Sequence, residues 1–146
     1  PDAESEKKIL QLVRGEVAKA PAAKFNPLTV EDILAARQAV LTVHMSEAIE
    51  EYLVQLIVAT RHPEKYDAKL AGQVLYGASP RATIALDRCA KINAWIDGRD
   101  FVTPEDIHAV IYDILRHRII LSFEAQAEGV TADGIIEALL RIVPLP

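Results

Sequence analysis

The chain has 146 residues, 51% hydrophobic and 5% aromatic, with a formal net charge of −5 at pH 7, so it can bury the core of one domain. The negative charge argues against general nucleic-acid binding, which needs a positive surface. A single cysteine excludes an internal disulfide and indicates a reducing compartment. The sequence shows no run of about 18 apolar residues, so we expect no membrane span, and we recognise no signal peptide.

The N-terminal part of the sequence predicts two helices joined by a linker. Apolar residues recur at helical spacing between Glu4 and Lys19, and the segment 21–27, with proline at both ends, is typical of a linker. A second helix is expected from Thr29 to about Val40, with Asp32 completing a capping box at its start. We expect four apolar residues of this helix to face inward: Ile33, Leu34, Val40 and Leu41.

The central part predicts two more helices. Ser46 begins the clearest amphipathic stripe, and Pro63 ends it. The next helix is expected from Pro80 to Ile96, and the segment 63–77 before it looks irregular. The members of the stripe recur at intervals of three or four residues and should face the core: Ile49, Tyr52, Leu53, Leu56, Ile57 and Thr60.

Two helices are also expected near the C-terminus. Thr103 caps a helix that runs to about Arg118, and the last helix covers about Ala132 to Ile142. Residues 119–130 are ambiguous, because a short strand near 119–122 and the tail of a helix fit equally well. The sequence therefore predicts an all-α fold, a small helical bundle with at most this one short strand.

The segment 77–82, Gly-Ala-Ser-Pro-Arg-Ala, places a cation at a helix start. Ser79 suits the N-cap, and Pro80 suits the first helical position, where its missing N–H costs nothing. The free N–H groups and the helix dipole favour an anion there, yet Arg81 stands in this first turn. Its position indicates a bound anion such as phosphate, or else an acidic neighbour. A capped helix with a surface arginine is the plainer interpretation.

Other candidate sites are weaker. Residues 72–79 have the glycine spacing of a phosphate-binding P-loop, but Ala78 stands where the essential lysine must be. The four histidines lie in separate predicted elements, and no pair has the spacing of metal ligands. We interpret Asp106 as a helix cap, His108 as a surface histidine and Cys89 as a small core residue.

The remaining arginines suggest structural roles. The cluster 116–118, Arg-His-Arg, lies at a predicted helix end, where cations suit the dipole, and a nucleic-acid-binding domain would depend on this cluster alone. Arg61 also closes its helix, and Arg88 shares a helix face with Arg81. We expect salt bridges or helix-end pairing for Arg61, Arg88, Arg116 and Arg118. The pattern gives Arg99 no role.

Four segments, in this order, together resemble the C-terminal half of MoxR-type AAA+ ATPases. They are Leu-Ile-Val-Ala-Thr-Arg at 56–61, Gly-Ala-Ser-Pro-Arg-Ala at 77–82, Gly-Arg-Asp-Phe-Val-Thr-Pro-Glu-Asp-Ile at 98–107 and Leu-Arg-His-Arg at 115–118. The resemblance spans nearly the whole chain. It implies that 1–27 is the end of the AAA+ core with a linker, and that 28–146 is the helical lid domain. Because the chain starts at Pro1 without a methionine, we expect it to be a piece of a longer protein.

The resemblance implies an ATP site that is shared between this lid and an upstream α/β core. Arg81 matches the sensor-2 arginine, which reaches the phosphates from the lid, and Ser79 and Pro80 match the helix start that aims it. The Walker A lysine, the Walker B carboxylates and the sensor-1 residue belong upstream. The chain alone should therefore not hydrolyse ATP, and the ligands of the Mg²⁺ expected in the full-length protein lie outside it.

The implied parent protein is a chaperone-like ATPase of the bacterial cytoplasm. It would form a homo-oligomeric ring and remodel a protein substrate that the sequence does not identify, without binding nucleic acid. The alternative is a free-standing helical module that binds a protein partner through its acidic surface. That alternative predicts a gene encoding only these residues, whereas a lid requires an upstream strand, a GxxxxGK[ST] motif and a helix.

Overall fold

The computed structural model describes residues 2–17 and 26–146. The chain divides into two compact units, Pro1–Ile33 and Leu34–Pro146, and each is described by itself. The N-terminal unit holds α1 (Ala3–Val17) and the first turn of α2 (Val30–Leu41). The predicted end of the first helix and most of the predicted linker, residues 18–25, lie outside the described residues.

Both N-terminal helices keep most of their described large apolar residues exposed. Along α1, Ile9 and Val13 are 54% and 47% exposed. α2 begins with the predicted capping box, in which the Thr29 N–H donates to Asp32 Oδ2 at 2.8 Å and the Asp32 N–H donates to Thr29 Oγ1 at 3.1 Å. Caps and periodicity form a helix without specifying what covers it.

The prediction that the apolar residues of α2 face inward is wrong, because α2 has no buried residue. Ile33, Leu34 and Leu41 are 47%, 53% and 72% exposed, and Val40 is half-buried.

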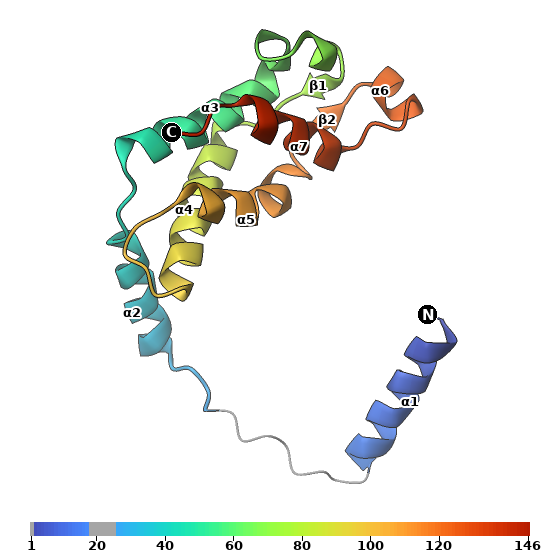
Figure 1. The fold of residues 1–146 in the computed structure, drawn as a ribbon. Coiled ribbons are helices and arrows are strands. Elements are labelled where there is room, and N and C mark those ends of the chain that lie inside the picture. Colours follow the sequence, from blue (N-terminus) through green and yellow to red (C-terminus); the bar gives the residue numbers. More distant parts are fainter. Residues whose placement is uncertain (1, 18–25) are drawn as a thin grey trace. The chain divides into compact units, whose positions relative to one another are not determined.

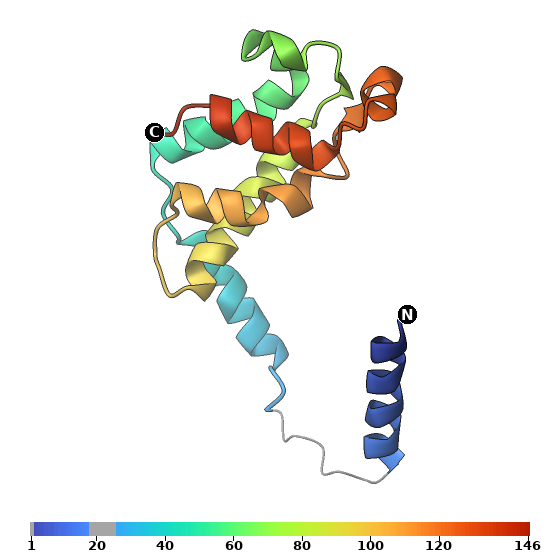
Figure 2. The ribbon, with the colours of Figure 1, turned by 45° about the vertical axis from the view of Figure 1, so that its right-hand side comes forward.

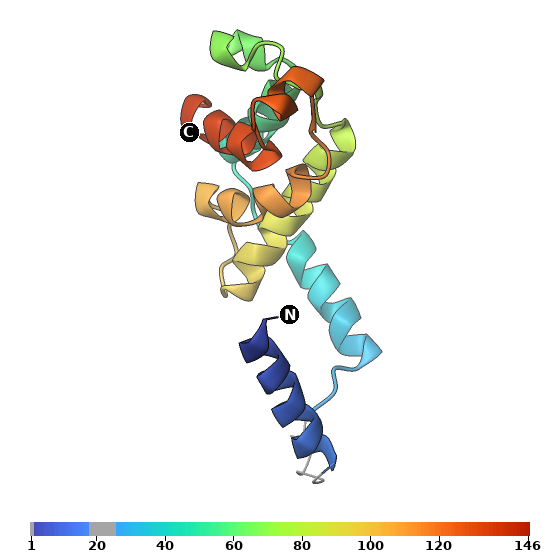
Figure 3. The ribbon, with the colours of Figure 1, turned by 90° about the vertical axis from the view of Figure 1, so that its right-hand side faces the viewer.

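The larger unit is a helical bundle built from α3 (Glu47–Arg61), α4 (Pro80–Ile96), α5 (Pro104–Leu115) and α7 (Ala132–Ile142) (Figure 1). α4 packs on α5 and α3, while α7 packs on α3 and α5, as Figures 2 and 3 show from two further sides. The whole predicted stripe of α3 is buried, so that prediction is confirmed. Among the largest fully buried side chains are Leu53, Leu56, Ile57, Leu86, Ile107, Ile111, Leu115, Ile135, Ile136 and Leu139.

A two-stranded antiparallel sheet joins β1 (Val74–Tyr76) to β2 (Ile120–Leu121). The short strand expected near 119–122 is therefore present. The prediction that 63–77 is irregular is wrong in part, because this segment contains two 3₁₀ turns, Pro63–Lys65 and Ala68–Leu70, and β1. The partner of β1 lies far away in the sequence, so no local pattern marks it as a strand.

The helix boundaries agree with the sequence except at one end. α4 and α7 have the predicted limits, but α5 ends at Leu115 rather than near Arg118. The N–H groups of Arg118 and Ile119 both donate to the Leu115 carbonyl oxygen, at 2.8 and 3.1 Å. This turn ends α5, because the chain must become extended to form β2. The short helix α6 (Phe123–Ala127) follows and is capped by Ser122.

A buried tyrosine connects α3 to α5. The Tyr52 hydroxyl is hydrogen-bonded to His108 Nε2 at 2.7 Å, and Tyr52 is only 3% exposed. The interpretation of His108 as a surface histidine is therefore wrong, since its half-buried ring has a partner on another helix. Burial raises the pKa of the Tyr52 hydroxyl.

We expect Tyr52→Phe to lower the free energy of unfolding by about 1 kcal/mol, because one hydrogen bond is lost while the packing of the ring is kept. Chemical denaturation of the chain measures this change. Tyr76→Phe is the control, since Tyr76 is 64% exposed and makes no side-chain hydrogen bond with the described residues. Equal stability of the wild type and the Tyr52→Phe variant would contradict the expectation.

Candidate functional site

The start of α4 is fixed by its contact with the end of α3. Gly77 approaches α3 so closely that a Cβ there would lie 2.3 Å from the Thr60 carbonyl oxygen. The next residue, Ala78, is fully buried, and its N–H donates to Thr60 Oγ1 at 2.9 Å. Ser79 then occupies the N-cap in extended conformation, and Pro80 is the first residue of α4. The position of the helix start is therefore set by α3.

Arg81 lies in the first turn of α4 and is exposed. Among residues 2–17 and 26–146, its side chain makes no hydrogen bond or ion pair, so no described acidic neighbour accounts for its position. Ser79 stands at the N-cap, but its side chain makes no capping hydrogen bond. The structure thus leaves an arginine, a serine hydroxyl and a helix N-terminus together at one surface.

Two of the arginines interpreted as structural are engaged as expected. Arg116 Nε donates to Asp133 Oδ1 at 2.7 Å, which ties the end of α5 to the start of α7. Arg118 donates to the Ile114 carbonyl oxygen in the last turn of α5. The Arg116 contact joins two helices of the bundle, whereas the Arg118 contact stays within the end of α5.

Arg61 and Arg88 differ from that expectation. Both are exposed, and neither makes a salt bridge or a hydrogen bond with the rest of the described chain. Arg88 lies two turns after Arg81 on the same helix. Along the described part of α4, the arginines are therefore the cations that lack an internal partner, whereas Lys91 pairs with Asp87 at 2.9 Å.

Half-buried Arg99 and buried Asp106 form an ion pair that sequence reasoning missed. Asp106 is 1% exposed, and Arg99 donates to both of its carboxylate oxygens at 2.6 Å. Asn93 Nδ2 and the Thr103 N–H also donate to this carboxylate, each at 2.8 Å. With these donors in place, the carboxylate is saturated, so the cluster is a structural clamp between α4 and α5.

The electrostatics of this clamp follow from its contacts. Burial acts to raise the pKa of Asp106, but hydrogen bonds from Arg99, Thr103 and Asn93 outweigh it and hold this pKa well below its usual range. In turn, Asp106 and Asp97 raise the pKa of the Arg99 guanidinium. The sequence did offer a signal, because the Thr-x-x-Asp start of α2 recurs at Thr103, and only at this second start does an arginine stand seven residues before the aspartate.

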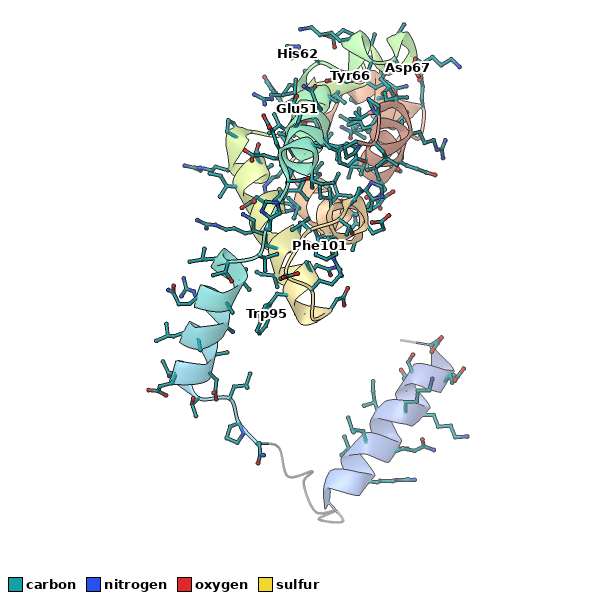
Figure 4. All side chains as sticks on the ribbon, turned by 60° about the vertical axis from the view of Figure 1, so that its left-hand side comes forward. Glu51, His62, Tyr66, Asp67, Trp95 and Phe101 are labelled. Atoms are coloured by element: carbon teal, nitrogen blue, oxygen red, sulfur yellow. The ribbon has the colours of Figure 1, made fainter. Side chains whose placement is uncertain are left out.

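Grooves elsewhere on the larger unit do not include Arg81. One, of about 540 Å³, lies between α3, α4 and the end of α2, with Arg88 and Lys91 in its lining. Another, of about 440 Å³, lies between α3 and the last four residues. Figure 4 shows Glu51 and Tyr66, which line this second groove, toward one end of the unit, with Trp95 and Phe101 at the other.

The described residues lack two further features. No group of three or more His, Cys, Asp or Glu residues there is arranged to hold a metal ion. No helix in residues 2–17 and 26–146 combines the length and the apolar character needed to cross a membrane. The candidate site is the surface around Arg81, where an arginine, a serine at the N-cap and a helix N-terminus lie together.

Comparison with known proteins shows the family to which the chain belongs. Residues 69–139 match a family model described as the AAA lid domain. Over 120 residues the chain is 34% identical to the chaperone MoxR1 of Mycobacterium tuberculosis, which covers 82% of this chain and 32% of that protein. It is also 38% identical over 106 residues to the protein MoxR of Methylorubrum extorquens, covering 68% of this chain and 31% of the other. The chain carries a MoxR-type AAA+ lid domain.

A solved structure extends the likeness beyond the lid. The chain is similar to a crystal structure of a candidate ATPase from Cytophaga hutchinsonii, with a TM-score of 0.83 and 41% sequence identity. The match covers 99% of this chain and 44% of the chain in that crystal structure. The chain spans about a third of the length of the curated relatives it matches. The range matched by the lid model includes Arg81 and the segments 98–107 and 115–118.

Proposed function

We propose that the lid supplies Arg81 to an ATP site, which it completes together with a nucleotide-binding core in the same longer protein. One observation carries this proposal. Arg81 is exposed and unpaired within the described residues, at a helix start that α3 holds in place, inside a domain that matches the AAA lid. A phosphate at this point would meet a guanidinium fork and a helix N-terminus together.

In this proposal Arg81 acts as a sensor-2 arginine. Its charge stabilises the negative charge on the transferred phosphoryl group, and its contact with the phosphates couples the position of the lid to the bound nucleotide. Ser79 and Pro80 form the helix start that directs Arg81. The core would supply the Walker A lysine and the carboxylates that hold Mg²⁺, so hydrolysis requires both parts.

The parent protein in this proposal is a cytoplasmic, chaperone-like ATPase that assembles as a homo-oligomeric ring and remodels a protein substrate. The relative from Mycobacterium tuberculosis is itself called a chaperone, which supports this role. ATP hydrolysis by the full-length protein carrying Arg81→Ala tests the proposal. If its rate and its affinity for nucleotide equalled those of the wild type, the sensor role would be refuted.

We expect the isolated chain to bind ATP only weakly, with a Kd of about 1 mM or higher. One arginine and a helix end supply only part of a site, and their contacts must offset the loss of ligand freedom. Isothermal titration calorimetry with ATP measures the affinity. The Arg81→Ala chain should show less binding still, and a micromolar Kd for the wild-type chain would contradict the expectation.

A further inference from the structure

We propose that Thr60 is a positioning residue for Arg81 and that it acts through the start of α4. This inference rests on the proposed contact between Arg81 and phosphate. Thr60 lies in the last turn of α3 and is fully buried, although the described core is otherwise almost entirely apolar. Buried polar side chains are costly unless their hydrogen bonds are satisfied, so the partners of this hydroxyl define its role.

The hydroxyl of Thr60 makes two hydrogen bonds, one within α3 and one to the segment before α4. It donates its single proton to the Ile57 carbonyl oxygen at 2.7 Å. Threonine hydroxyls in helices commonly donate to a carbonyl oxygen of the preceding turn in this way. It also accepts the Ala78 N–H at 2.9 Å, from a residue 18 positions later in the chain. Because the first bond already fixes the proton, a lone pair is directed to Ala78. The second bond therefore specifies the path of the segment before α4.

Gly77 brings the segment before α4 into close contact with the backbone of α3. A Cβ at Gly77 would lie 2.3 Å from the Thr60 carbonyl oxygen and 2.7 Å from the Arg61 nitrogen, so only glycine fits. Two consecutive residues thus rest against one turn of α3, one by close approach of the backbone and one by a hydrogen bond. This pair of contacts locates the chain just before the helix.

The location of Ala78 determines that of Arg81, because only two residues separate them. Pro80 fixes its own φ, and the Ala82 N–H donates to the Ser79 carbonyl oxygen at 2.8 Å. Ala82 is fully buried, which anchors the other side of the first turn. A shift of the segment at Ala78 therefore moves the guanidinium away from its place.

The test uses ATP hydrolysis and nucleotide binding by the full-length protein that contains this chain. We expect Thr60→Val, which keeps the shape but cannot accept the Ala78 N–H, to raise the KM for ATP about 10-fold. Thr60→Ser retains the hydroxyl and should stay within about 2-fold of the wild type. In a protein that already carries Arg81→Ala, Thr60→Val should cause no further change, since the residue it positions is gone.

The outcomes separate the two proposals. If Arg81→Ala changes nothing, the proposed function fails, whatever Thr60 does. If Arg81→Ala weakens binding but Thr60→Val does not, or if their effects are fully additive, the positioning role is overturned. Should Thr60→Val not fold, Gly77→Ala displaces the same segment while leaving the Thr60 hydroxyl intact, and it should show the same non-additivity with Arg81→Ala. Unfolding of both variants would show that the contact serves folding alone and would overturn the inference.

Discussion

Replacing Arg81 with alanine in the full-length protein is expected to lower ATP turnover by about 10- to 100-fold and to weaken nucleotide binding. Arginines that stabilise transferred phosphoryl groups contribute up to about 10³- to 10⁵-fold to the rate, and we expect less here because Mg²⁺ and the core lysine share the charge. The side chain is exposed and has no internal partner in the described chain, so stability should not change. Steady-state hydrolysis, nucleotide binding and thermal unfolding measure the three quantities.

Arg88→Ala is the matched control for this experiment. Arg88 has the same charge, lies on the same helix and is likewise exposed without an ion pair among the described residues. It should leave hydrolysis close to the wild-type rate. An equal loss in both variants would point to the general charge of α4 rather than to a phosphate contact. Arg81→Lys adds a second distinction, because lysine keeps the charge but lacks the planar fork.

Replacing Asp106 with alanine is expected to lower the free energy of unfolding by about 3 kcal/mol. This carboxylate is 1% exposed, and its removal would leave donors of Arg99, Asn93 and Thr103 without their acceptor. The expected loss lies at the lower end of the range for a buried ion pair, because Arg99 is 28% exposed and can still be partly solvated. Chemical denaturation of the chain measures the loss.

Acid should produce a related effect. The pKa of Asp106 is lower in the folded chain than in the unfolded chain, so its contribution to stability is complete above about pH 4. That contribution is lost as the pH falls further toward the folded-state pKa. The wild-type chain should therefore lose more stability below pH 4 than the Asp106→Ala variant.

Asp32 provides the control for the clamp. It closes the same kind of capping box at the start of α2, but it is exposed and has no arginine partner in the described chain. Asp32→Ala should have a much smaller effect on unfolding and on its pH dependence. If both aspartates mattered equally, the cap alone, and not the ion pair, would account for the result.

The helix limits that the sequence predicted best depend on local signals. α4 begins at Pro80 after Ser79 and ends before Gly98, which adopts a φ of +76°, and each of these residues acts on its own neighbours. β1 could not be predicted in this way, because its pairing partner, Ile120–Leu121, is remote in the sequence. The exposure of α2 could not be predicted either, since the periodicity of apolar residues does not show whether another element packs on the helix.

The candidate site likewise combines features that local sequence signals predict with features that depend on contacts between separate elements. Arg81 could be singled out because a cation in the first turn of a helix contradicts a local preference. The role of Thr60 and the partnership of Arg99 with Asp106 depend on contacts between separate elements. In the sequence, Thr60 was one more member of an amphipathic stripe, and its bond to Ala78 is visible only in the structure.

The fastening of α4 at both ends has a mechanical consequence. Its start rests on Thr60 through Gly77 and Ala78, and its far end is tied to α5 through Asn93. A helix of 17 residues is about 25 Å long and is stiff over that distance. We therefore expect it to move as one rigid body. Trp95, the single tryptophan of the chain, lies in its last turn, so we expect a displacement of the first turn, where Arg81 lies, to change the surroundings of this indole.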